Sequence, residues 1–288
     1  MKSTSTEVEV VIFDFDGTAT DAEVEGESYR EGFILDLATL TGLSMDRVRA
    51  LTAEFEAQVL ADPDSYGWVY NGRIVAPATV DPYLRMAPVA RMILADSGLQ
   101  LPPEFVDRLL TGVLYRHNYA KTKTCFQPDA RSTFNVVGAE KYTYIVTNST
   151  PSKVQEKVRE LARDTGGSLD WLVERVHGDA KKYVVHDDSI PGIEHSLELE
   201  GLRRPVLLQR PHYYHVLEEI RAKHGVTWDK VAVVGDIFEL DLALPYALGC
   251  TIILVANEYT PIYERDFVTA SPNGYVVSCL DEVRKLLV

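Results

Sequence analysis

Cysteine is scarce in this chain, and the three that occur form no Cys-x-x-Cys pair. An odd number of unpaired cysteines is typical of free thiols in a reducing compartment rather than of a disulfide framework. Long apolar runs are also lacking: the longest stretches, such as 251–256, are far too short to cross a bilayer. The first ten residues contain no apolar segment of the kind that signal peptides carry. We therefore expect a cytoplasmic protein.

Positive charge is in deficit, with 29 Lys and Arg against 43 Asp and Glu and a formal net charge of −14. Nucleic acids and anionic membranes both require a basic surface, so the composition argues against either partner. A small anionic substrate stays compatible if a metal ion and one or two cations dominate the pocket. The sequence carries no signal for an oligomeric state.

What is present is a series of short, apolar, β-branched runs. The first, Val8 to Phe15, ends in Asp-Gly-Thr, and similar runs follow at 142–146, 231–234 and 251–255. Helical patterns separate the later runs. Strands that alternate with helices indicate an α/β fold, a Rossmann-like doubly wound parallel sheet with its site at the carboxyl ends of the strands.

The chain between residues 22 and 125 has a different character. Helical patterns dominate it, a segment rich in proline and glycine interrupts it, and we identify no convincing strand series. The simplest organisation is a catalytic core formed by 1–21 and 126–288, with a mainly helical cap domain inserted as 22–125. The stretch 166–205 is ambiguous. Within it, 171–177 and 183–186 can form a β-hairpin extension, whose role the sequence does not reveal.

The first chemical motif is Phe13-Asp14-Phe15-Asp16-Gly17-Thr18. Side chains alternate along a strand, so Asp14 and Asp16 can share one face. Two neighbouring carboxylates repel each other unless a cation or a proton lies between them. The stretch VVIFDFDGTATD, residues 10–21, resembles the first motif of the haloacid dehalogenase (HAD) superfamily.

This resemblance implies a Rossmann-like core with a variable cap and, in most members, activity on phosphorylated compounds. It also implies that Asp14 is a nucleophile that forms an aspartyl-phosphate and that Asp16 is a general acid and then a base. A carboxylate nucleophile divides phosphoryl transfer into two easier displacements. Members that cleave carbon–halogen bonds lack the second acid, whereas an alkoxide leaving group needs a proton. The presence of Asp16 therefore favours phosphoryl transfer.

A second motif, expected where the next strand ends, is supplied by Thr147-Asn148-Ser149. By the same resemblance, the Thr147 hydroxyl and the Asn148 backbone N–H would bind a phosphoryl oxygen. Pro151 suits the first turn of the helix that follows.

The third expected element is a cation, usually lysine, that screens the nucleophile and the phosphate. We prefer Arg210, which precedes Pro211 and an amphipathic helix at the family's usual placement, although arginine is bulkier than lysine and not equivalent to it. Lys181 or Lys182, in the stretch GDAKKY, is the alternative if the extension folds back over the site.

The fourth element is Gly235-Asp236, which closes an apolar strand and is followed by Asp241. It resembles the family's acidic motif. The implied ligands of Mg²⁺ are Asp14, the backbone carbonyl of Asp16, Asp236 and, directly or through water, Asp241. Such hard oxygen donors are what Mg²⁺ prefers. We expect Glu239, between them, to face solvent.

Together these motifs predict a Mg²⁺-dependent phosphatase that hydrolyses a small phosphorylated metabolite. One alternative is a phosphomutase or another phosphotransferase on the same scaffold, in which a substrate hydroxyl accepts the phosphoryl group. Another is a non-catalytic protein that binds a phospho-ligand. Specificity is expected to reside in the cap, but the sequence does not name the substrate. The candidates for contacts with its non-reacting part are Trp68, Tyr70, Arg73, Arg116 and His117.

Overall fold

The computed structural model describes residues 8–114, 116–117, 123–163, 169–187 and 190–288. Parts of the predicted ranges 1–21, 22–125 and 166–205 therefore lie outside the described residues. The chain divides into two compact units. One consists of Met1–Asp21, Val69–Ala76 and Phe126–Val288; the other consists of Ala22–Trp68 and Pro77–Cys125.

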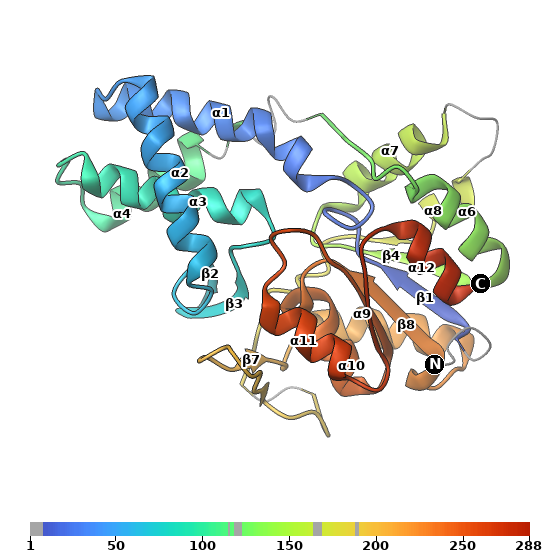
Figure 1. Cartoon of the computed structure of the whole chain (residues 1–288). Coiled ribbons are helices and arrows are strands. Elements are labelled where there is room, and N and C mark those ends of the chain that lie inside the picture. The colour runs from blue at the N-terminus through green and yellow to red at the C-terminus, as the bar shows by residue number, and fades with distance from the viewer. Residues whose placement is uncertain (1–7, 115, 118–122, 164–168, 188–189) are drawn as a thin grey trace. The chain divides into compact units, whose positions relative to one another are not determined.

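The first unit is built on a six-stranded parallel sheet in the order β10-β9-β8-β1-β4-β5 (Figure 1). The predicted α/β class with a doubly wound parallel sheet is confirmed. The strands are short and β-branched, as the apolar runs indicate. Their bounds are β1 Val10–Phe13, β4 Tyr142–Val146, β5 Val176–His177, β8 Val231–Gly235, β9 Thr251–Val255 and β10 Gly274–Val277.

The two faces of the sheet bury separate hydrophobic cores. Alternate residues of β1 point to opposite faces: Val10 and Ile12 join one core, and Val11 and Phe13 join the other. The first core is covered by α9 Pro211–His224, the π-helical turn η3 Phe238–Leu242, α10 Ala243–Leu248 and α11 Ile262–Ala270. The second is covered by α6 Ala130–Glu140, α7 Pro151–Ala162, α8 Asp170–Val173 and α12 Leu280–Leu287. A 3-10 turn, η2 Trp228–Lys230, leads into β8.

The second unit is mainly helical, with its own apolar core. Its elements are α1 Ala22–Thr41, α2 Met45–Ala61, α3 Pro82–Asp96, α4 Pro103–Arg108 and the π-helical segment η1 Leu109–Leu114. Side-chain caps begin two of these helices: Ser44 accepts the N–H of Arg47 at α2, and Asp81 accepts the N–H of Tyr83 at α3.

The absence of strands predicted for 22–125 is wrong. Two strands, β2 Gly67–Tyr70 and β3 Arg73–Pro77, form a hairpin. Asn71 and Gly72 connect them, with φ of 49° and 74°. An Asn-Gly pair with positive φ at both positions is the most favoured two-residue hairpin connection, because its twist matches that of the strands. The Asn71-Gly72 pair is therefore the sequence signal by which this hairpin can be predicted.

The hairpin predicted from 171–177 and 183–186 is also wrong. Residues 170–173 form α8, and β5 joins the edge of the main sheet beside β4. The antiparallel pair in this region is formed instead by β6 Ser196–Leu197 and β7 Val206–Leu207. Its strands have only two residues each, too few to show the alternation by which a strand is recognised in a sequence.

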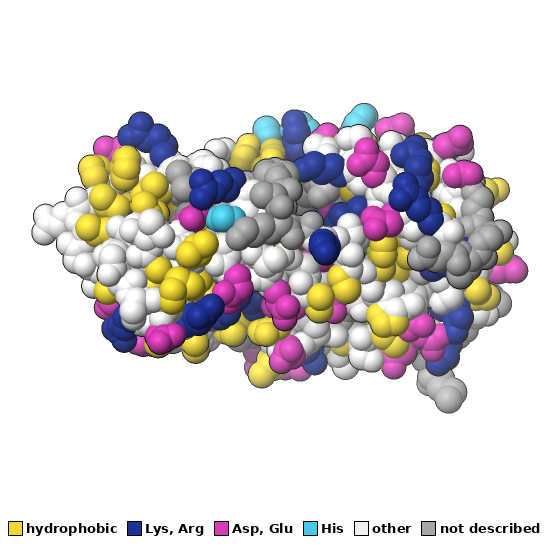
Figure 2. Space-filling model, turned by 90° about the horizontal axis from the view of Figure 1, so that it is seen from above, with side chains coloured by type: hydrophobic (Ala, Val, Ile, Leu, Met, Phe, Trp, Pro, Cys, Tyr) yellow, Lys and Arg dark blue, Asp and Glu magenta, His cyan; other side chains and the backbone are white. Residues whose placement is uncertain are grey.

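Charged side chains of both signs are interspersed on the face that Figure 2 shows. Among the described residues, no helix combines the length and the apolar character needed to span a membrane.

Candidate active site

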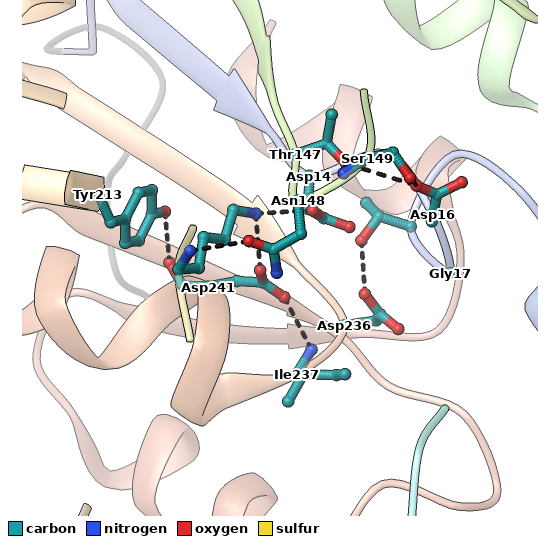
Figure 3. A network of polar contacts seen from close by, with 12 residues as sticks. Asp14, Asp16, Gly17, Thr147, Asn148, Ser149, Tyr213, Asp236, Ile237 and Asp241 are labelled. Atoms are coloured by element: carbon teal, nitrogen blue, oxygen red, sulfur yellow. Dashed lines mark hydrogen bonds and ion pairs between the residues drawn. The ribbon is translucent and has the colours of Figure 1, made fainter. Parts of the chain in front are cut away.

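Three acidic residues meet at the carboxyl edge of the main sheet. Asp14 follows β1 and Asp236 follows β8, which are neighbouring parallel strands in register. The backbone N–H of Asp14 donates to the carbonyl of Val234 at 2.8 Å, which extends the strand pairing to the edge. Asp241 reaches the same place from η3. All three side chains are buried, and one carboxylate oxygen from each lies within 4.8 Å of the others (Figure 3).

Close packing and hydrogen bonds fix Asp236. The Thr18 hydroxyl donates to Asp236 Oδ1 at 2.9 Å. Gly17 has a φ of 87°, and a Cβ atom added there would lie 2.3 Å from Asp236 Oδ2. Glycine is therefore required at this position for two reasons: the backbone has a positive φ, and a side chain would collide with Asp236.

Asp241 is held from three directions. Its Oδ2 accepts the backbone N–H of Ile237 at 3.1 Å, and its backbone carbonyl accepts the buried hydroxyl of Tyr213 at 2.8 Å. A Cβ atom added at Gly235 would lie 2.4 Å from Asp241 Cβ, so glycine before Asp236 makes room for Asp241. In the fourth motif, Asp236 thus supplies one carboxylate of the cluster, and Gly235 leaves the space that a second, that of Asp241, occupies.

Lys182 is the cation that contacts the acidic cluster. Its Nζ lies 2.6 Å from Asp14 Oδ1 and 2.8 Å from Asp241 Oδ1, and its side chain is 1% exposed. Burial alone would lower the pKa of Lys182, but the carboxylates of Asp14 and Asp241 outweigh it and raise that pKa. The lysine therefore remains a full positive charge between the two acids. Its backbone N–H donates to Asn148 Oδ1 at 2.7 Å, so the side chain of Asn148 fixes the loop that carries Lys182.

Arg210, the cation preferred from the sequence, does not contact Asp14, and that preference is corrected in favour of Lys182. The Arg210 side chain is completely buried, and its guanidinium donates to three backbone carbonyls, those of Leu207 at 2.9 Å, Val75 at 2.8 Å and Lys182 itself. Arginine suits this position because its N–H donors are spread over three nitrogens of a rigid fork and reach carbonyls in different places, whereas the donors of a lysine all belong to one nitrogen. Arg210 thus supports the backbone of Lys182, the residue that contacts Asp14 in its place.

Asp16 is bound by residues of the loop after β4 and of α7. Its Oδ2 accepts the hydroxyl of Ser149 at 2.7 Å and that of Thr147 at 3.4 Å, and its Oδ1 accepts Lys157 Nζ at 3.1 Å. The loop after β4 therefore lies beside Asp16, and Ser149 points toward Asp16 in Figure 3. The side chain of Asp16 is 38% exposed, whereas Asp14 is buried.

The electrostatics of the cluster favour a cation. Burial raises the pKa of Asp14 to about 7; Lys182 opposes this shift, and Asp241 and Asp16 add to it. Asp14 and Asp241 share the ammonium of Lys182, and Asp236 places a third buried carboxylate within 4.8 Å of theirs, so several acidic groups lie together in a site that water reaches poorly. Three buried carboxylates at this separation are a donor set that fits Mg²⁺, which takes few protein carboxylates and keeps several waters. The carbonyl of Asp16 stays a predicted further ligand.

The expectation that Glu239 faces solvent is wrong. Its side chain is fully buried, and Arg204 binds both of its carboxylate oxygens at 2.7 Å. The candidate substrate residues of the insertion also have partners: Arg73 pairs with Asp187 at 2.7 Å, Tyr70 stacks edge-on against Tyr183, and Arg116 and His117 both contact Asp36.

Sequence reasoning missed two contacts that shape the site, those of Ser149 and Lys157, and gave a third, that of Lys182, only as the alternative to Arg210. Lys182 follows β5, a strand of two residues that is too short to recognise, so a lysine at a strand end looked like one in a surface loop. Ser149 belongs to the second motif, but the sequence predicts no contact between its hydroxyl and Asp16. Lys157 lies more than one turn inside α7, where a lysine in an amphipathic helix gives no sign that it reaches another element.

Comparisons with known proteins give fold likeness alone. No family model matches the chain, and no curated protein matches its sequence. A predicted phosphoglycolate phosphatase from Haemophilus somnus 129pt superposes with a TM-score of 0.52 at 16% identity, covering 98% of each chain. A structure described as the putative HAD-hydrolase YfnB from Bacillus subtilis, bound to magnesium, superposes with a TM-score of 0.53 at 11% identity, covering 98% of this chain and 99% of the other.

An L-2-haloacid dehalogenase from Xanthobacter autotrophicus is also matched, with a TM-score of 0.47 at 16% identity over 97% of this chain and 98% of the other. The expectation drawn from VVIFDFDGTATD is confirmed at the level of the fold: this chain has the fold of the haloacid dehalogenase superfamily of hydrolases.

Proposed function

We propose that this protein is a Mg²⁺-dependent phosphatase that hydrolyses a small phosphorylated metabolite through an aspartyl-phosphate on Asp14. The observation that carries the proposal is the buried cluster of Asp14, Asp236 and Asp241, two of which, Asp14 and Asp241, bind the ammonium of Lys182. A second acid, Asp16, lies two residues beyond Asp14. A nucleophile, a cation, a metal-binding acid set and a proton donor are the parts that stepwise phosphoryl transfer requires.

Asp14 supplies the nucleophilic oxygen. Its carboxylate is fixed by the strand pairing of its backbone and by Lys182, so the attacking atom is held in place before substrate arrives. Lys182 offsets the repulsion between this carboxylate and an incoming phosphate. Asp236 and Asp241 would hold Mg²⁺ with Asp14, and a bound Mg²⁺ supplies stabilisation of the charge on the phosphoryl oxygens.

Asp16 separates phosphate chemistry from dehalogenation. An alkoxide is a poor leaving group and needs a proton as its bond to phosphorus breaks, whereas a halide leaves without one. The partly exposed carboxyl of Asp16 suits a group that delivers this proton and then takes one from the water that attacks the aspartyl-phosphate. After the second step, Asp14 is regenerated and inorganic phosphate is released.

The proposal is tested by a phosphate-release screen over a library of phosphorylated metabolites with Mg²⁺ and with EDTA, beside a halide-release screen on 2-haloacids. We expect phosphate release that needs Mg²⁺, and none from Asp14→Asn, which should keep the fold because the amide is isosteric. Release of halide alone, or full activity in Asp14→Asn, would overturn the proposal. Formation of an isomeric phosphosugar with little free phosphate would identify a mutase instead.

A further inference from the structure

Helix α7 contributes a residue to the site that the sequence motifs do not include. Lys157 Nζ lies 3.1 Å from Asp16 Oδ1, and the two residues are 141 positions apart in the chain. Ser149 meanwhile donates to the other oxygen of the same carboxylate at 2.7 Å. Asp16 is therefore gripped at both oxygens, by a hydroxyl from the loop after β4 and by an ammonium from α7.

An ion pair at a partly exposed position often contributes nothing, because two long side chains lose conformational freedom in forming it. Lys157 differs from such pairs in its surroundings. Its side chain is 24% exposed, and its ammonium lies 5.8 Å from the ring centroid of Phe15. Phe15 is completely buried, and in the sequence it stands between Asp14 and Asp16. The aromatic ring and the carboxylate both restrict the ammonium, so part of the ordering cost is met by packing.

The side chain of Asp16 is less restricted by its own surroundings than that of the buried Asp14, so its orientation depends on the groups that bind it. The Asp16 side chain is 38% exposed and follows the end of β1, in a turn that includes Gly17 with its positive φ. An aspartate side chain there has several rotamers open to it, whereas proton transfer to a leaving oxygen requires hydrogen-bonding reach. Among the described residues that hold Asp16, Lys157 is the one that carries charge, and it approaches from an element other than the catalytic loops.

We propose that Lys157 is a positioning residue of the catalytic site, which together with Ser149 orients the carboxyl of Asp16 toward the leaving-group oxygen of the substrate. This inference rests on the proposed phosphatase function. It assigns to α7 a part in the protonation of the leaving group and no part in nucleophilic attack. Loss of Lys157 should therefore slow the reaction most for substrates whose leaving group most needs a proton.

The test compares two probes, glycerol 2-phosphate, whose alkoxide needs a proton to leave, and p-nitrophenyl phosphate, whose phenolate needs little help. General acid catalysis contributes roughly 10²- to 10⁴-fold. A misplaced acid should therefore cost Lys157→Met about ten-fold or more in kcat/KM on glycerol 2-phosphate and less than about three-fold on p-nitrophenyl phosphate. The measured quantity is kcat/KM because it reports the steps up to release of the leaving group and excludes the later hydrolysis of the aspartyl-phosphate, which both probes share. Lys157→Arg, which retains the cation, should recover most of the loss. Lys153→Met removes the same charge from an exposed position of α7 and should change neither rate.

A second arm shows whether Lys157 acts through Asp16. In an Asp16→Asn background, adding Lys157→Met should lower kcat/KM no further on either probe. Equal losses on both probes, or an undiminished effect in the Asp16→Asn background, would overturn the positioning role while leaving the phosphatase proposal intact. If the wild-type protein releases phosphate from neither probe nor any metabolite, the proposed function fails, and this inference fails with it.

Discussion

Lys182→Met is the substitution whose consequences the structure defines most fully. It removes an ammonium that lies 2.6 Å from Asp14 and 2.8 Å from Asp241, and replaces it with an apolar side chain of similar length. The side chains of Lys182, Asp14 and Asp241 are 1%, 10% and 5% exposed, so water can do little to replace the lost charge. The two carboxylates then face each other without a protein cation between them.

The size of the effect follows from the two bonds that are lost. Hydrogen bonds to charged groups contribute about 1.5–3 kcal/mol each, or about 3–6 kcal/mol for two. Breaking a buried ion pair by removing one partner costs about 3–5 kcal/mol. The desolvation cost of Lys182 itself disappears in the variant, so we expect the lower end, about 3 kcal/mol in the free energy of unfolding without metal. The loss of charge stabilisation for phosphate should lower kcat/KM by about 10²- to 10³-fold.

Urea denaturation measures the first quantity and phosphate release the second, each with and without Mg²⁺. Because Mg²⁺ can neutralise the unpaired carboxylates, it should raise the stability of Lys182→Met more than that of the wild type. The matched control is Lys181→Met, which removes the same charge from the adjacent, exposed residue and should leave activity and stability within experimental error. If Lys182→Met retained wild-type stability and kcat/KM, or if Lys181→Met behaved in the same way, the assignment of Lys182 as the site cation would be refuted.

Three further substitutions test other parts of the account. Arg210→Lys leaves at least one buried carbonyl without a donor and should cost about 1–3 kcal/mol in urea denaturation, with a smaller loss of kcat/KM than Lys182→Met causes; a wild-type unfolding curve would contradict the three-carbonyl role. Gly17→Ala places a Cβ atom against Asp236 and should lower kcat/KM for phosphate release by at least about ten-fold through the displaced carboxylate, whereas Gly249→Ala, with a similar φ of 92° and open space around it, should affect stability alone; equal activities would argue against the close contact. Burial raises the pKa of Glu264, whose Oε1 lacks a partner among the described residues, so the folded state binds this proton more tightly than the unfolded state and loses stability as pH rises above the ordinary glutamate range. Glu264→Gln should therefore be more stable than the wild type at pH 8 and lose that advantage toward pH 4, as followed by urea denaturation; a difference independent of pH would show that the carboxyl is not held protonated.

The parts of the fold that rest on periodicity could be predicted from the sequence. The runs that became β1, β4, β8 and β9 are apolar and β-branched because both faces of a parallel sheet are covered. Acids and small polar residues at the carboxyl ends of these runs marked the site, because the carboxyl ends of parallel strands meet at one edge of the sheet. Asp14 and Asp236 were found by this reasoning and lie together at the sheet edge.

What could not be predicted depends on contacts that leave no local pattern. Lys182 and Arg210 are both cations in loops before α9, and the choice between them turned on a motif spacing rather than on any property that distinguishes their surroundings. Their roles became separable only when the loop conformation placed one against two carboxylates and the other against three carbonyls. Glu239 misled for a related reason, because a glutamate is buried only when a partner such as Arg204 is supplied from elsewhere in the chain.

The central claim is that Asp14 becomes covalently phosphorylated. The most direct measurement is peptide mass spectrometry after acid quenching of wild-type and Asp16→Asn protein that are turning over p-nitrophenyl phosphate with Mg²⁺. The account predicts one added phosphoryl group on the peptide that contains Asp14, with more of it in Asp16→Asn, where its hydrolysis is slowed, and none in Asp14→Asn. A phosphoryl group on a different residue, or continued turnover in Asp14→Asn, would contradict it.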